Sequence, residues 1–167
     1  MNRTPTPDEL NEIHRLIGQS ICALQFLEDA LKKLLTMKID LRTPGIFTKA
    51  EAQDALAKRD RNMLGIALKT VRDYSVMSPM FVERLTRFTE ERNWLVHRSL
   101  DSFAEGLYSI QGRTDVSERL SKFLVEAEHL KKLIVSEINN FAESHGIDTD
   151  GATRRAHASL RKLKGEA

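Results

Sequence analysis

Three side chains suited to phosphate chemistry lie within one short stretch of the chain: Arg92, Asn93 and His97. Arginine carries a permanent positive charge and a planar set of donors that matches phosphate oxygens. Histidine is the side chain best suited to exchange protons near neutral pH. An amide beside them can bind a ligand oxygen or orient the imidazole. The combination indicates chemistry on a phosphodiester.

The motif falls near the end of a helical segment that begins at Ser78 and Pro79. At 100° per residue, four apolar residues of this segment share a sector about 80° wide with Arg92 in its middle: Phe81, Leu85, Phe88 and Leu95. A guanidinium among core positions is costly unless it is paired or opens into a cleft. We therefore expect either a structural ion pair, with Glu28 as the candidate partner, or a functional cleft at Arg92.

His97 follows Arg92 at a spacing that separates the two side chains. On one continuous helix the separation is about 140° around the axis and about 7.5 Å along it. A working site then needs the helix to end between them, or a second copy of the motif across a two-fold interface. Asn93 and His97 are four residues apart and lie on neighbouring faces.

The composition is that of one soluble globular domain: 167 residues, 41% hydrophobic and 30% charged. Cys22 is the single cysteine, so one chain can build neither a disulfide framework nor a thiolate zinc cluster. The other histidines show no ligand spacing, and we expect no metal ion and no other cofactor. No signal-type segment and no run of about 18 apolar residues is present, which favours a cytoplasmic protein with no membrane partner.

The charge is unevenly distributed. From Arg154 to the end, five basic residues face Glu166 alone, so the rest of the chain is slightly acidic. We divide the chain into a helical domain over residues 1–146 and a basic tail over residues 147–167. We expect the tail to be mobile, with a helix over residues 152–163 as the alternative.

The pattern of apolar residues predicts an all-α fold, an up-and-down bundle of four to five helices. Thr6 and Thr48 each precede a glutamate by three residues, the signature of a capping box. We expect a loop with one short strand around residues 107–110 before the last long helix. The expected helices cover about 6–37, a short helix from 48, about 63–74, 78–97 and 115–146.

The segment from Arg92 to His97 resembles the signature of the HEPN superfamily: an Arg, usually followed by a polar residue, then a His after four to six intervening positions. The stretch Phe26 to Leu31 is similar to the acid-containing first helix of many members. The resemblance covers roughly residues 10–143.

The resemblance implies a bundle that dimerises so that two motifs line one cleft. It further implies a metal-independent endoribonuclease of toxin or phage-defence type, with RNA as substrate and an antitoxin or regulatory protein as a possible partner. In such an enzyme His97 is the acid/base, Arg92 stabilises the charged phosphorane and Asn93 positions the substrate. Further expected participants are Glu28 as a supporting acid and Arg98, Arg154 and Arg155 as RNA contacts.

A second interpretation belongs to a different class of function. Many members of this superfamily are not catalytic, and the chain could be a helical dimerisation or adaptor module in which Arg92 is structural. Toxins of the superfamily that pair with a nucleotidyltransferase often have a Tyr two residues after the His, whereas this chain has Ser99. Inactivation by nucleotidylation at that position is therefore not expected.

Overall fold

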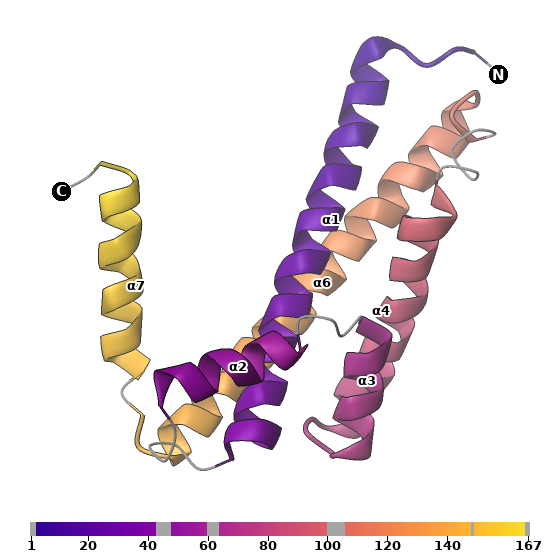
Figure 1. The fold of residues 1–167 in the computed structure, drawn as a ribbon. Coiled ribbons are helices and arrows are strands. Elements are labelled where there is room, and N and C mark those ends of the chain that lie inside the picture. Colours follow the sequence, from indigo (N-terminus) through magenta and orange to yellow (C-terminus); the bar gives the residue numbers. More distant parts are fainter. Residues whose placement is uncertain (1–2, 43–47, 60–63, 100–105, 148, 166–167) are drawn as a thin grey trace.

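The computed structural model describes residues 3–42, 48–59, 64–99, 106–147 and 149–165; the side chains of residues 149, 150, 152, 155 and 156 lie outside this description. All regular secondary structure in these residues is helical (Figure 1). The predicted all-α class is confirmed, although the described residues form six α-helices rather than four or five. The elements are α1 (Pro7–Leu35), the π-helix η1 (Thr36–Leu41), α2 (Lys49–Arg59), α3 (Leu64–Asp73), α4 (Pro79–His97), α6 (Ile110–Ser144) and α7 (Thr149–Leu163).

The capping boxes predicted for the first two helices are present. The backbone N–H of Glu9 donates to the Thr6 hydroxyl, and the backbone N–H of Thr6 donates to the Glu9 carboxylate. Thr48 and Glu51 make the same exchange at the start of α2. Hydrogen bonds from the Arg3 side chain and the Thr6 backbone lower the pKa of Glu9 to about 2. The start of α1 is therefore tied to the segment before it.

Helices α1 and α6 lie side by side and run in the same direction (Figure 1). Glu9 pairs with Arg113 at their N-terminal ends, with 3.3 Å between the guanidinium Nε and the carboxylate. At the other end, Lys38 of η1 pairs with Glu137 of α6. Apolar residues of these two helices make up 13 of the 22 buried core residues in the described part of the chain.

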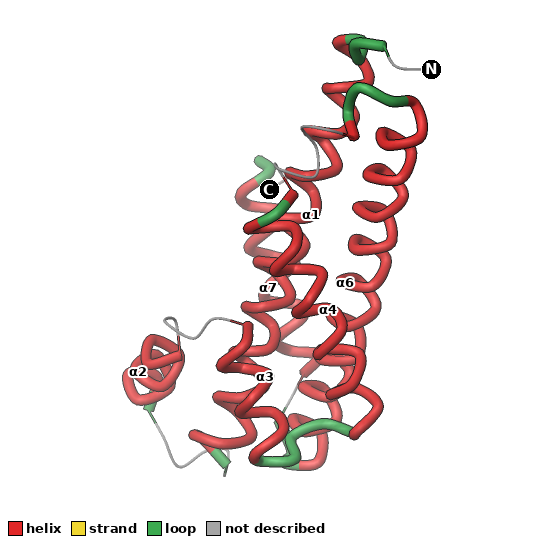
Figure 2. The backbone as a smooth tube through the Cα atoms, turned by 90° about the vertical axis from the view of Figure 1, so that its right-hand side faces the viewer, coloured by secondary structure: helices red, strands yellow, loops and turns green. Residues whose placement is uncertain are grey.

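Helix α4 runs antiparallel to α6. Arg84 near the start of α4 pairs with Glu126, whereas Glu91, seven residues later, pairs with Arg119, seven residues earlier on α6. The shorter α3 packs against both α1 and α4. With ten residues against the nineteen of α4, α3 reaches only about 15 Å, and α4 continues past it (Figure 2).

The connection before α6 differs from the expectation. No strand forms among the described residues around 107–110; the chain makes a turn, and α6 begins at Ile110 rather than at residue 115. Ser109 caps the helix, because its hydroxyl accepts the backbone N–H of Gly112. The glycine at 112 resembles a loop residue in the sequence, yet it is in the first turn of the helix.

The C-terminal segment forms α7, which is longer than the helix considered as the alternative to a mobile tail. Gly146 adopts a φ of +70° two residues after the end of α6 at Ser144. Among the described elements α7 makes its main contact with α6, and it stands apart from the bundle (Figure 1). No helix in the described part of the chain has the length and apolar character needed to cross a membrane.

Gly112 marks a close approach of two backbone segments, which gives a test of the observed start of α6. A Cβ at this position would lie 2.7 Å from the Cα of Gly106 and closer still to its carbonyl oxygen. We expect Gly112→Ala to lower the stability by about 1–3 kcal/mol through overpacking. Gly18→Ala on α1 meets no atom within 4 Å and should raise stability by about 0.5–1 kcal/mol.

Thermal denaturation followed by circular dichroism measures both variants. Equal melting temperatures for the two alanine variants would contradict the close approach of Gly112 to Gly106.

Candidate functional site

The site is built on the second half of α4. Ser78 caps this helix, since its hydroxyl accepts the backbone N–H of Phe81, and Pro79 fits the first turn. Phe88 stacks on Phe123 of α6 with ring centroids 4.5 Å apart. These contacts fix the rotation of α4 and place the apolar sector predicted from the sequence against the core.

A charged clasp holds the C-terminal half of α4 on α6. The Arg119 guanidinium donates to both carboxylate oxygens of Glu91, at 2.7 and 3.0 Å. The same guanidinium lies over the Trp94 ring, 3.7 Å from its centroid. Sequence reasoning missed this clasp because the pairing of residues 28 positions apart depends on helix packing. The clasp positions the three motif residues that lie next to it.

Arg92 is half-buried in the apolar sector of α4, as the spacing predicts. It occupies the phase of Leu85 and Phe88 but lies beyond the stretch that α3 can cover. Its Nη1 donates to Oδ1 of Asn93 at 3.2 Å, while its Nε is buried and has no hydrogen-bond partner. None of the carboxylates that the structure describes forms an ion pair with it. Arg92 is thus a partly desolvated cation without an anionic partner among the residues that the structure describes.

His97 is the last residue of α4 and is exposed. Because α4 continues through both residues, the helix does not end between Arg92 and His97. The two side chains therefore diverge by about 140° on one chain. Asn93 is exposed and lies between them around the helix, bonded to Arg92 on one side. The first condition for a working site, a helix end between Arg92 and His97, is therefore not met. The second condition, a second copy of the motif across a two-fold interface, stays a prediction.

Glu28 is not brought to Arg92 within one chain. Along α1, Glu28 lies about 28 Å from Glu9. Along α6, Arg119, which lies beside the motif, is only about 9 Å from Arg113. Since Glu9 and Arg113 are paired, Glu28 is nearer the opposite end of the bundle. One of its carboxylate oxygens is buried without a hydrogen-bond partner. The ion pair considered for a structural Arg92 is not formed among the described residues.

The other candidate RNA contacts are separate from the motif. Arg98 is the C-cap of α4; its backbone N–H donates to the Trp94 carbonyl at 2.9 Å, and its side chain is exposed. Arg154 is exposed on α7. The side chain of Arg155 lies outside the described residues. Arg98 is therefore next to His97 in the chain, whereas Arg154 lies on a different helix.

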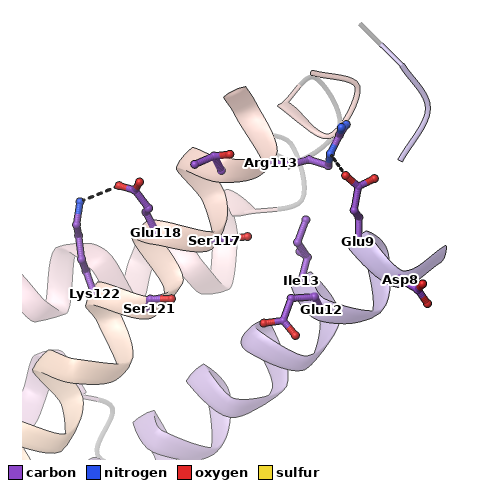
Figure 3. A pocket seen from close by; sticks show the side chains of 10 residues that line it. Asp8, Glu9, Glu12, Ile13, Arg113, Ser117, Glu118, Ser121 and Lys122 are labelled. Atoms are coloured by element: carbon purple, nitrogen blue, oxygen red, sulfur yellow. Dashed lines mark hydrogen bonds and ion pairs between the residues drawn. The ribbon is translucent and has the colours of Figure 1, made fainter. Parts of the chain in front are cut away.

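The larger clefts in the described part of the chain do not include the motif. One lies between the starts of α1 and α6, with Arg113 and Glu9 at one end and Glu118 and Lys122 at the other (Figure 3). Another lies between α4 and α6 around Arg84, on the side of α4 away from Asn93. Neither is lined by Arg92, Asn93 or His97. A cleft at the motif requires a further surface.

No protein-family model matches the chain, and neither does any curated protein or solved structure. Among the described residues no three His, Cys, Asp or Glu side chains are grouped so that they could hold a metal ion. The functional interpretation therefore depends on the geometry of α4 and on the resemblance of its motif.

Arg92 has no carboxylate partner in the described part of the chain, which predicts a small effect of its removal on stability. We expect Arg92→Met to change the free energy of unfolding by less than about 1 kcal/mol, because no described carboxylate loses its partner. Arg113→Met is the matched comparison, since Arg113 is 5% exposed and donates to the Leu107 carbonyl at 2.6 Å. That variant should lose about 2–4 kcal/mol.

Chemical denaturation of the two variants gives both free energies. A loss for Arg92→Met as large as that for Arg113→Met would show that Arg92 is a structural residue.

Proposed function

We propose that this chain is a metal-independent endoribonuclease of the HEPN type that acts as a homodimer. Arg92, Asn93 and His97 of the two copies line one shared cleft. The observation that supports this most strongly is Arg92, a half-buried cation with a buried, unpartnered Nε and no described carboxylate beside it.

An unpaired, partly desolvated guanidinium favours an anionic ligand. Burial removes water from the charge, and the cost is recovered when phosphate oxygens supply the missing acceptors. A structural arginine would have that acceptor within its own chain, as Arg113 does with Glu9 and the Leu107 carbonyl, although its Nη2 is likewise buried without a partner. The difference between the two arginines is the carboxylate partner, and this difference supports a ligand-binding role for Arg92.

The need for two copies follows from the geometry of α4. Arg92 and His97 diverge on one chain, so one phosphate cannot contact both side chains of the same motif. A large apolar side chain beside the motif remains exposed: Val96 of α4 at 47%. A second copy that covers such surface would bring its own motif to the first. A two-fold axis then places Arg92 of one copy near His97 of the other.

The residue types supply what metal-free RNA cleavage needs. One imidazole removes the proton of the 2′-hydroxyl, whose oxygen attacks the adjacent phosphorus. The bond from phosphorus to the 5′-oxygen breaks, and a protonated imidazole donates a proton to the departing oxygen. Two His97 residues provide one base and one acid, while Arg92 neutralises the phosphorane and Asn93 orients it. The products are a 2′,3′-cyclic phosphate and a 5′-hydroxyl.

Cleavage of an unstructured RNA in the presence of EDTA tests this function. The wild-type protein should produce ends with 2′,3′-cyclic phosphate. His97→Ala and Arg92→Ala should each reduce the rate by about 10²-fold or more, because proton transfer or charge stabilisation is lost. His14→Ala and Arg72→Ala replace exposed residues of the same types on α1 and α3 and should cleave as the wild type does.

A folded wild-type protein that leaves the RNA intact would refute the enzyme. The non-catalytic dimerisation module would then be the better interpretation. Equal activity in His97→Ala and His14→Ala would show that any cleavage comes from a contaminant or from another site.

A further inference from the structure

A line of cationic and titratable side chains runs along one face of α7. Arg154, His157, Arg161 and Lys164 are spaced by three or four residues and fall within a sector about 80° wide. His157, Arg161 and Lys164 line one shallow surface groove together with Leu160. We call the four residues the α7 stripe. It extends about 15 Å along the helix.

The part of the stripe from His157 to Lys164 lies in a segment without acidic residues. Residues 151–165 contain five Lys and Arg and no Asp or Glu. Helix α6 differs, because its lysines pair with glutamates one turn away, as in Lys122 with Glu118 and Lys131 with Glu128. Neither Arg161 nor Lys164 forms an ion pair with a residue that the structure describes. Apart from Asp150 at its start, α7 carries charged side chains of one sign only, and such a surface attracts a polyanion.

Helix α7 also gains little from the bundle. It stands away from the other helices in Figure 1, and Leu160 and Leu163 are 52% and 85% exposed. Like charges three and four residues apart weaken a helix, and isolated helices of this length are marginal in water. A bound polyanion would remove the repulsion and strengthen the helix.

We propose that α7 is an arm that holds the sugar-phosphate backbone of RNA along its stripe. The inference rests on the proposed function for the identity of the polyanion. The two leucines are the only large apolar residues among residues 151–165, which contain no aromatic residue. A helix that inserts into a membrane surface carries a broader apolar and aromatic face. Contacts to phosphates carry no sequence information, so the arm retains RNA without selecting its sequence.

The test measures binding without cleavage. A fluorescein-labelled single-stranded oligouridine is titrated with the His97→Ala protein in EDTA over a series of salt concentrations. Adding Arg161→Gln and Lys164→Gln should weaken binding roughly tenfold, and should reduce the slope of log K against log salt by about 1.4 for two lost phosphate contacts. Lys58→Gln with Lys69→Gln removes the same charge from exposed positions on α2 and α3 and should leave binding unchanged.

Two results would overturn the arm: unchanged oligouridine binding by the α7 variant, or an equal loss in both double variants. Binding to phosphatidylserine vesicles that alone depends on Arg161 and Lys164 would also overturn it, in favour of a membrane contact. RNA cleavage is measured separately, in proteins that keep His97. Loss of oligouridine binding in the α7 variant supports the arm even if the protein cleaves no RNA, whereas intact cleavage with unchanged binding refutes the arm alone.

Discussion

The parallel packing of α1 against α6 is the contact on which the rest of the structure depends. It joins the two longest helices and contains most of the fully buried side chains. Two parallel helices cannot be joined by a short loop, so the chain must return along the bundle between them. Helix α4 is that return segment, which places it antiparallel to α6 and brings Glu91 to Arg119. The position of the motif therefore follows from the antiparallel packing of α4 against α6.

Arg92 lies on the part of α4 that extends beyond the shorter α3. Along the first half of α4, α3 covers the apolar sector, and Leu85 is fully buried. Farther along, Arg92 occupies this sector and is half-buried, whereas Leu95, one turn later, is buried again. The Arg92 Nε is buried without a hydrogen-bond partner, and its Nη1 donates to Asn93. Together with the divergence of His97, this supports a site that two copies complete.

Local signals in the sequence predict the helices, whereas the contacts between helices require the structure. Three helix starts can be predicted from the sequence because each cap joins residues three positions apart: Thr6, Thr48 and Ser78. The phase of Arg92 is equally predictable, since it depends only on helical periodicity. The start of α6 at Ile110 could not be predicted from the sequence. Gly112 is a glycine because the Gly106 backbone approaches it closely, and this contact is visible only in the structure. The Trp94, Arg119 and Glu91 clasp and the separation of Glu28 from Arg92 depend on how α4 and α1 lie against α6.

The shared cleft is tested most directly with mixed dimers. A wild-type chain and a His97→Ala chain carry different affinity tags and are co-expressed, and the dimer bearing both tags is isolated. If the two His97 residues act on one phosphate as base and acid, the mixed dimer should cleave RNA as slowly as the His97→Ala homodimer, about 10²-fold or more below the wild type. A mixed dimer with about half of the wild-type activity would contradict a site shared between copies.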